Sequence, residues 1–175
     1  DMLNGVNLAM EEINKDGLQV KGKTVRLEVV AVDDRADAKT GVEVAKQLVD
    51  AGVVAVIGHL NSGVSIAAAP VYAEKGIAQL AISTNPKYTE LGLPTTFRLV
   101  ANDRLQAKAI GSYSAAQFPA TRYATVDDST PYGKDLAAGA AVELKKAKKE
   151  VVVQQSFDEK NVKFDEFAKK LQDEK

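Results

Sequence analysis

Hydrophobic positions along the chain follow two spacings, one typical of helices and one typical of buried strands. Val6, Met10 and Ile13 recur at helical spacing within residues 2–15. In contrast, residues 53–58 read VVAVIG, a short and wholly apolar run of the kind that forms a strand buried on both faces. The two patterns indicate a domain in which amphipathic helices cover buried strands.

The same patterns alternate along the whole chain. They predict helices over residues 2–15, 37–52, 62–75, 103–118, 132–148 and 161–174. They predict strands within residues 24–34, 53–58, 77–82, 95–100, 122–128 and 151–157. Regular alternation of helix and strand is the signature of right-handed βαβ units and a parallel sheet with helices on both faces. The predicted fold class is therefore α/β.

Both ends of the pattern are helical. A doubly wound domain normally begins with a strand, whereas this chain opens on a helix and closes on one. We expect from this that material is missing at both ends and that the first sheet lacks its first strand. A sheet without that strand would expose a hydrophobic edge, which favours association.

Length, composition and charge narrow the classes of protein. A chain of 175 residues that is 45% hydrophobic can form one large domain or two small ones. The balance of 23 basic and 24 acidic residues argues against a nucleic-acid partner. No apolar run approaches the roughly 20 residues of a membrane-spanning helix, so direct insertion into a membrane is not expected. The chain has no cysteine, so thiols say nothing about its compartment.

In open α/β sheets, ligands bind beyond the carboxyl ends of the strands. The polar stretches that follow predicted strands are therefore the candidate sites, and they are Asp33–Asp34, 58–62, 83–85 and 127–132. The two aspartate pairs, at 33–34 and at 127–128, could hold Mg²⁺ or accept a phosphoryl group, although such acids more often cap a strand end or the next helix. The stretches at 58–62 and 83–85 carry hydroxyls and amides.

The known signatures of catalysis and of cofactor binding are missing. No Gly-rich phosphate loop and no GxGxxG motif follows a strand, so nucleotide binding is unsupported. His59 is the only histidine, and without cysteine a metal site has too few ligands, so we interpret His59 as structural. Ser62 is not embedded in GxSxG, which argues against a nucleophilic serine. We therefore expect no catalytic residue, no cofactor and no metal.

Ser62, Ser83 and Thr84 fit binding better than reaction. Ser62 opens a predicted helix, where a serine commonly serves as N-cap. That role is compatible with a ligand, because the free N–H groups of a helix N-terminus attract carboxylates and phosphates. Ser83 and Thr84 end the next strand, before Asn85. Two hydroxyl-bearing turns on neighbouring strands would form a neutral, hydrogen-bonding cradle for a small anion.

Four segments carry a family resemblance. VAVIGHLNSGVSIAAAPVYAEKGIAQLAISTNPKYTE resembles the core of the branched-chain (Leu/Ile/Val) amino acid binding proteins, which are type I periplasmic solute-binding proteins of ABC transporters. GVNLAMEEIN, VVAVDDRADAKTGVEVAKQLV and YATVDDSTPYGKDLA resemble the same family in the same order. The resemblance covers essentially all 175 residues. It is specific in combination, although no single motif is diagnostic.

The resemblance implies the type I periplasmic-binding-protein fold, in which two doubly wound parallel-sheet lobes clamp a ligand. Residues 1–101 would belong to the first lobe, without its first strand, and residues 102–175 to the beginning of the second. The sequence would then amount to about half of a family chain. Many members pair two cysteines near the ligand loops, and Ala36 and Asn61 stand in those places here.

The resemblance also implies residue roles. Ser62 matches the serine that takes the ligand's α-carboxylate. Ser83 and Thr84 match the pair that supplies a backbone carbonyl and a hydroxyl to the α-amino and carboxylate groups. Tyr132, before Gly133, matches the tyrosine that closes over the ligand. With the flanking amides, the expected ligand-binding residues are Asn61, Ser62, Ser83, Thr84, Asn85 and Tyr132.

The function implied is the capture of a small aliphatic amino acid between two lobes, with no bond made or broken. The partners would be that amino acid and the membrane permease of an ABC importer. We expect a periplasmic protein that has lost its signal peptide and is monomeric when complete. Three alternatives stay open: a sensory ligand-binding domain of the same fold, a single-domain flavodoxin-like or phosphoacceptor protein that uses Asp33 and Asp34, and an enzyme whose catalytic groups lie outside these 175 residues.

Overall fold

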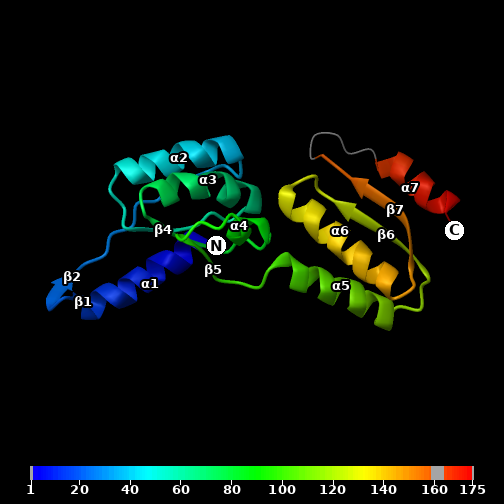
Figure 1. Ribbon diagram of the computed structural model, residues 1–175, viewed down its shortest axis with the longest axis horizontal. Helices are drawn as coiled ribbons and strands as arrows, with labels where there is room; N and C mark the ends of the chain where they lie inside the picture. The colour runs from blue at the N-terminus through cyan, green and yellow to red at the C-terminus, as the bar shows by residue number, and fades with distance from the viewer. Residues whose placement is uncertain (1, 159–163, 175) are drawn as a thin grey trace.

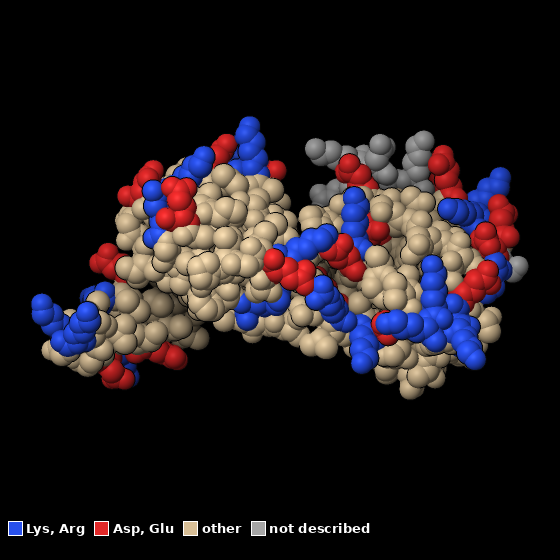
Figure 2. All heavy atoms as spheres, viewed as in Figure 1, with Lys and Arg blue, Asp and Glu red and all other residues tan. Residues whose placement is uncertain are grey.

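The protein folds into two α/β lobes that lie side by side (Figure 1). A computed structural model describes residues 2–158 and 164–174. The N-terminal lobe runs from helix α1 (Met2–Asp16) to strand β5 (Thr96–Arg98), and the C-terminal lobe from helix α5 (Asp103–Gln117) to helix α7 (Phe164–Asp173). Figure 2 shows charged side chains of both signs where the lobes meet.

The N-terminal lobe is built on a three-stranded parallel sheet. Strand β4 (Ala78–Ala81) lies in the middle, between β3 (Ala55–Ile57) and β5, so that Leu80 is in register with Ile57 and with Phe97. Two parallel pairings joined through a helix are the expected product of βαβ units.

Two helices of this lobe pack closely against each other and cover the sheet. Helix α2 spans Ala38–Asp50 and helix α3 spans Ser62–Glu74, and a short helix α4 spans Lys87–Glu90. Small residues permit the close approach, because a side chain at Gly41 would collide with Val64. The buried core consists of Ala45, Leu48, Val56, Ala68, Tyr72 and Ile77.

The C-terminal lobe pairs two parallel strands, β6 (Arg122–Asp127) and β7 (Glu150–Ser156), with helix α6 (Pro131–Lys146) between them in sequence. Helices α5 and α6 pack tightly. A Cβ atom at Gly111 would lie 2.8 Å from the carbonyl oxygen of Ala140, so glycine is needed for this contact.

Every helix and strand predicted from the pattern has a counterpart except the strand within 24–34. The predicted start of the last helix, at 161, lies outside the described residues. In place of the strand predicted within residues 24–34, the chain forms a short antiparallel hairpin of β1 (Leu18–Val20) and β2 (Lys23–Val25). Residues 26–34 pair with no strand in the described part of the chain. A strand is defined by hydrogen bonds to a neighbouring strand. An apolar segment that has no strand beside it therefore does not become one.

The unpaired stretch leaves an apolar edge on the N-terminal lobe. Val29, Val30 and Val32 are exposed, and so are Val54, beside β3, and Ile57 within it. Val54 is 87% exposed. Apolar residues of a sheet are normally covered by a neighbouring strand or helix, so this edge favours association.

Candidate functional site

The turn after β3 begins at Gly58, where the extended backbone of the strand ends. This glycine has a φ of 148°, which side chains of L-residues rarely tolerate, and its peptide bond to His59 is cis. The N–H of Gly58 still donates to the carbonyl of Leu80 at 3.0 Å, so the turn remains attached to the sheet. Glycine at this position lets the chain turn out of the strand and enter helix α3 within a few residues.

His59 holds this turn in place. Its Nδ1 lies 2.6 Å from Oδ2 of Asp34 and its Nε2 lies 3.1 Å from the hydroxyl of Tyr72, while its ring is buried. Its carbonyl accepts hydrogen bonds from the hydroxyls of Ser65 and Ser83, each at 3.1 Å. These contacts agree with the structural interpretation of His59.

Ser62 is not the N-cap that the sequence suggested. The N-cap position of α3 is Asn61, whose exposed side chain makes no capping bond, and Ser62 is the first helical residue. Its buried hydroxyl oxygen instead accepts the backbone N–H of Asn85 at 3.2 Å. A sequence pattern places a helix start only within a residue or two, and here that shift changes the partner of the hydroxyl.

Ser83 and Thr84 occupy the turn after β4. The Ser83 hydroxyl is buried 2.5 Å from that of Ser65 and also lies against the carbonyl of Leu60 at 3.2 Å. A hydroxyl with these neighbours joins the turn after β4 to the turn after β3. Thr84 is half-buried, and its carbonyl accepts the N–H of Asp103 at 2.8 Å.

Asn85 makes more contacts than the sequence indicated. It is fully buried, and both donors of its side-chain amide are used, by the carbonyl of Pro131 at 2.9 Å and by Oδ2 of Asp135 at 3.0 Å. Its Oδ1 accepts the N–H of Lys87 at 3.0 Å, and its carbonyl accepts Nη1 of Arg98 at 3.0 Å. The side chain therefore bridges the lobes.

The N-termini of helices α3 and α6 face each other across the lobe junction. A Cβ atom at Gly63, the second residue of α3, would lie 3.1 Å from Cγ of Pro131, the first residue of α6. Helix α6 is capped by Thr130, whose hydroxyl oxygen accepts the N–H of Gly133 at 3.0 Å. Both N-termini carry partial positive charge, so the region between them favours an anion.

The six residues expected from the sequence thus fall around one junction. Ser62 begins α3, Ser83, Thr84 and Asn85 form the turn beside it, and Tyr132 lies on α6 with its side chain 39% exposed. Asn61 is brought to the same helix end but points to solvent. The contact from Asn85 to Ser62 joins the two turns directly.

Sequence reasoning missed one buried charge beside this junction, the carboxylate of Asp103. Asp103 is 2% exposed, and its Oδ2 makes no hydrogen bond with any described residue. Burial raises the pKa of Asp103, and the nearby Thr84 hydroxyl and Arg98 guanidinium counter that rise only in part. A single acid at a helix start gives no pattern in sequence, so Asp103 could not have been found without the fold.

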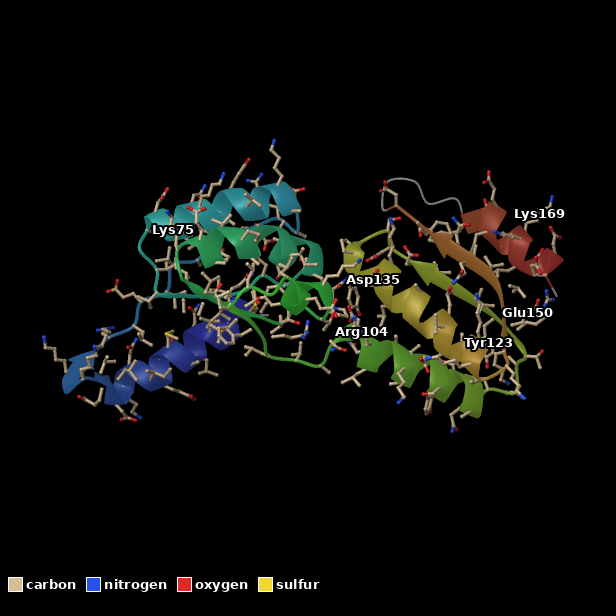
Figure 3. The ribbon with its side chains drawn as sticks, viewed as in Figure 1. Lys75, Arg104, Tyr123, Asp135, Glu150 and Lys169 are labelled. Atoms are coloured by element: carbon tan, nitrogen blue, oxygen red, sulfur yellow. The ribbon has the colours of Figure 1, made fainter. Side chains whose placement is uncertain are left out.

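Charged side chains also join the lobes. Lys87 Nζ lies 3.0 Å from Oδ2 of Asp135, and Arg104 Nη2 lies 2.5 Å from Oε1 of Glu90. The hydrogen bond from Lys87 holds the pKa of Asp135 below its ordinary value, and the one from Asn85 acts in the same direction. Figure 3 shows Asp135 and Arg104 on α6 and α5 where the lobes meet.

The two aspartate pairs cap turns. Asp33 and Asp34 accept the N–H groups two residues ahead, at 2.9 and 2.8 Å. Asp127 and Asp128 do the same, at 2.9 and 3.0 Å. Within residues 2–158 and 164–174, no group of three or more His, Asp or Glu side chains could hold a metal ion.

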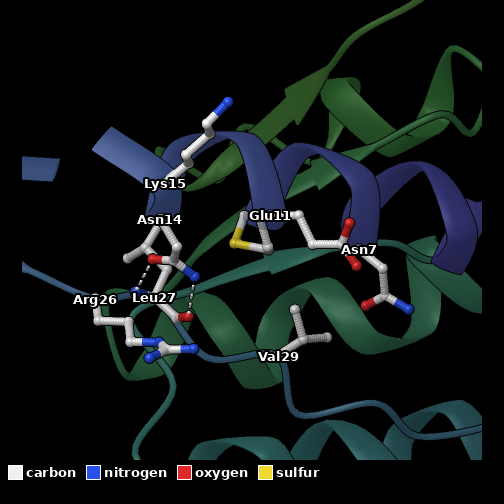
Figure 4. A pocket seen from close by; sticks show the side chains of 8 residues that line it. Asn7, Glu11, Asn14, Lys15, Arg26, Leu27 and Val29 are labelled. Atoms are coloured by element: carbon white, nitrogen blue, oxygen red, sulfur yellow. Dashed lines mark hydrogen bonds between the residues drawn. The ribbon is translucent and has the colours of Figure 1, made fainter. Parts of the chain in front are cut away.

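A groove of about 560 Å³ lies elsewhere, between α1 and the unpaired stretch (Figure 4). The Asn14 side chain joins its two walls, because its amide N–H donates to the carbonyl of Leu27 and its amide oxygen accepts the N–H of the same residue, both at 2.8 Å. None of the six expected ligand residues lines this groove. It is therefore separate from the junction site.

Comparison with known proteins identifies the family. The family model described as periplasmic binding protein matches residues 1–175. The chain belongs to the periplasmic binding protein family. A Leu/Ile/Val-binding protein homolog from Brucella melitensis biotype 1 is 42% identical over 134 residues, which is 76% of this chain and 35% of that one. The alternative of a single-domain flavodoxin-like or phosphoacceptor protein is thereby wrong.

Two solved substrate-binding proteins share the fold. An ABC transporter substrate-binding protein from Desulfitobacterium hafniense, in complex with Leu, is 30% identical with a TM-score of 0.79. A branched-chain amino acid transporter substrate binding protein from Streptococcus pneumoniae, in complex with isoleucine, is 26% identical with a TM-score of 0.83.

The extent of these matches confirms the predicted type I fold and its parallel sheets. The two superpositions cover 99% and 98% of this chain but 50% and 48% of the other chains. The periplasmic binding protein chain therefore spans about half the length of its solved relatives. None of its helices, within the described residues, is long and apolar enough to cross a membrane.

Proposed function

We propose that the complete protein is the solute-binding component of an ABC importer and holds a small aliphatic amino acid between its lobes. Membership of the periplasmic binding protein family supports this, as do the Leu/Ile/Val-binding relative and the two neighbours solved with Leu and isoleucine. The observation that carries the proposal is the meeting of two helix N-termini beside Ser62, where Gly63 approaches Pro131.

In this proposal the α-carboxylate of the ligand binds at the start of α3. The Ser62 hydroxyl, which already accepts the N–H of Asn85, can donate its own proton to a carboxylate oxygen. Free N–H groups in the first turn of α3 add further donors. Charge-assisted hydrogen bonds of this kind are stronger than bonds between neutral groups, so a few of them suffice to orient a small zwitterion.

The other expected residues complete the cradle. The carbonyl of Ser83 and the hydroxyl of Thr84 would meet the amino and carboxylate groups, and Tyr132 would cover the ligand from the opposite lobe. Asn61 and Asn85 flank this cradle, and Asn85 contributes through its backbone and the lobe contact, since its amide donors are already occupied. This is a task of recognition, and we propose no catalytic step for it.

The lobe boundary is proposed to lie at residues 101/102. Strands β5 and β6 belong to different sheets, and the side chain of Asn102 caps helix α5 by accepting the N–H of Leu105. A short connection of this kind can serve as a hinge, which lets the lobes close on the ligand. Residues 1–101 and 102–175 would then move as separate bodies.

The remaining proposals follow from the importer assignment. The partner is the membrane permease of an ABC transporter, the compartment is the periplasm, and the complete protein acts as a monomer. The protein is proposed to be a binding protein and not an enzyme. Amino acid recovered from the complex by chromatography should therefore be chemically unchanged.

Calorimetry on the complete protein tests the ligand class. Leucine, isoleucine or valine should bind with a 1:1 stoichiometry, whereas nucleotides and sugar phosphates should give no heat of binding. Binding of a sugar phosphate without any response to amino acids would overturn the proposal. Uptake of labelled leucine by cells that lack the protein should fall, which separates an importer from a sensory domain of the same fold.

A further inference from the structure

One acidic residue of the C-terminal lobe binds two residues of the ligand turn in the N-terminal lobe. Oδ2 of Asp135 accepts the side-chain amide of Asn85 at 3.0 Å and lies 3.0 Å from Nζ of Lys87. Asp135 is on α6, and its partners are 50 and 48 residues earlier in the chain. Figure 3 shows Asp135 on the end of α6 that faces the N-terminal lobe.

The same turn is fixed from the other side. Asn85 gives its backbone N–H to the hydroxyl of Ser62 at 3.2 Å, and its carbonyl receives Nη1 of Arg98 at 3.0 Å. Asn85 is completely buried, and the carbonyl of Pro131, also on α6, takes the second donor of its side-chain amide at 2.9 Å. Its orientation is therefore set by protein partners in both lobes and not by solvent. A change at Asp135 is therefore transmitted through one residue to Ser62.

We propose that Asp135 is a positioning residue that makes the ligand turn complete only when the two lobes are together. This rests on the proposed amino acid binding at Ser62. Opening of the lobes would separate Asp135 from Asn85 and Lys87. Asn85, whose N–H bonds the Ser62 hydroxyl, would then lose a hydrogen bond that holds its side chain. Only molecules in which this contact is made would have the complete ligand turn. The apparent ligand affinity would then fall in proportion to the fraction of such molecules.

The second ion pair between the lobes serves as a contrast. Arg104 and Glu90 also pair across the junction, at 2.5 Å, but Arg104 is the second residue of α5, close to the connecting segment 99–102. A residue beside the hinge moves little when the lobes open. Both ion pairs are largely exposed, and exposed pairs contribute little. The difference is that Asp135 also bonds the buried Asn85, whereas the Arg104–Glu90 pair has no such link to the ligand turn. Loss of this pair should therefore leave closure unchanged.

The test uses the complete protein, labelled with one fluorophore in each lobe, and compares Asp135→Asn with the control Arg104→Gln. The lobe-to-lobe distance is measured without ligand, leucine binding is measured by calorimetry, and unfolding temperature is measured without ligand. We expect Asp135→Asn to shift ligand-free molecules toward the open distance and to weaken leucine binding by about tenfold. We expect its unfolding temperature to match the parent, and Arg104→Gln to match the parent in all three measurements.

A second variant keeps the proposal testable if Asp135→Asn folds poorly. Lys87→Met removes one of the two donors to Asp135, and should weaken leucine binding less than Asp135→Asn does. Combined with Asp135→Asn, it should add almost nothing, since the two residues act on one contact.

Three outcomes would overturn the proposal. These are parental leucine affinity in Asp135→Asn, an unchanged lobe distance, or a loss of affinity matched by an equal loss of thermal stability. A parent protein that binds no amino acid would instead contradict the proposed function. The ligand-free distance measurement would still report on Asp135 in that case, so the two failures can be told apart.

Discussion

The carboxylate of Asp34 and the imidazole of His59 are in direct contact, with Oδ2 2.6 Å from Nδ1. The pair joins the end of the unpaired stretch to the turn after β3, although 25 residues separate them. The other ring nitrogen meets the hydroxyl of Tyr72, on α3, at 3.1 Å. This chain of three polar side chains fixes the turn that leads into Ser62, which allows its effect on binding to be tested without touching the ligand residues.

Tyr72→Phe removes the last contact of that chain. Loss of one buried hydrogen bond should lower the free energy of unfolding by about 0.5–1.5 kcal/mol. The imidazole ring of His59 then has one hydrogen-bond partner instead of two, so the turn is held less firmly. Leucine affinity of the complete protein should therefore also fall, by about twofold or more. Denaturant unfolding and calorimetry measure the two effects.

Tyr88→Phe is the matched control for that variant. Tyr88 is equally buried, and its hydroxyl donates to the carbonyl of Gln79 at 2.9 Å and not to His59. Its backbone N–H donates to the carbonyl of Asn85 at 3.2 Å, and phenylalanine keeps that bond. It should lose similar stability and keep parental affinity. Equal affinities in both variants would show that the His59 chain has no influence on binding.

Ser62→Ala tests the proposed carboxylate ligand. The variant loses the acceptor of the Asn85 N–H, which should cost about 1–3 kcal/mol of stability, and also a bond to the ligand. Leucine affinity should therefore fall by about ten- to a hundredfold. Asn61→Ala is the comparison, because that side chain makes no capping bond and its removal should change stability by less than about 0.5 kcal/mol.

Parental affinity in Ser62→Ala would remove this residue from the site. The cradle would then depend on the backbone N–H groups of α3 and on Ser83 and Thr84. The comparison variant guards against a general effect of disturbing the helix start, since Asn61 and Ser62 are adjacent.

Asp103→Asn should stabilise the protein at neutral pH. Burial raises the pKa of Asp103 above its ordinary value of 3.8, so the folded state binds a proton more tightly than the unfolded state does. The stability associated with this group is therefore present below 3.8 and is lost as the pH rises through the folded-state pKa. At pH 7 the parent carries a buried carboxylate oxygen without a partner in the described chain, and its replacement should gain about 1 kcal/mol.

Thermal unfolding of both proteins between neutral pH and pH 4 measures this. The advantage of Asp103→Asn should shrink steadily as the pH falls, because the parent takes up the proton that the variant does not need. An advantage that is independent of pH, or a variant less stable than the parent at pH 7, would contradict this account of Asp103.

Val54→Lys should reduce the self-association of a polypeptide that consists of residues 1–175. Val54 is 87% exposed, and Val29, Val30, Val32 and Ile57 of the same lobe are exposed as well. A lysine on a sheet edge opposes edge-to-edge pairing. Sedimentation velocity over a range of concentrations measures the effect. Val142→Lys, at an exposed apolar position on α6, should leave association unchanged. Equal association in both variants and the parent would show that this edge is not the contact.

Short-range patterns were sufficient for most of the fold. The apolar spacing and the break at Gly58 predicted β3 and α3, and the order of elements predicted the parallel sheets. The hairpin of β1 and β2 was missed, although its signal is present. Lys21 and Gly22 both have positive φ, at 49° and 76°, as a two-residue turn between strands requires, and glycine after a polar residue is a usual sign of such a turn.

The sequence by itself determined which segments are helices and strands, the family, and the two polar turns that meet at the site. Those properties depend on residues close together in the chain and on short motifs that follow one another in the family's order. Only the tertiary structure decided the partner of each polar group. The Ser62 hydroxyl meets Asn85, and Asn85 meets Asp135, across separations of 23 and 50 residues. A hydrogen bond forms over about 3 Å, so it depends on how helices and lobes pack, which no local pattern encodes.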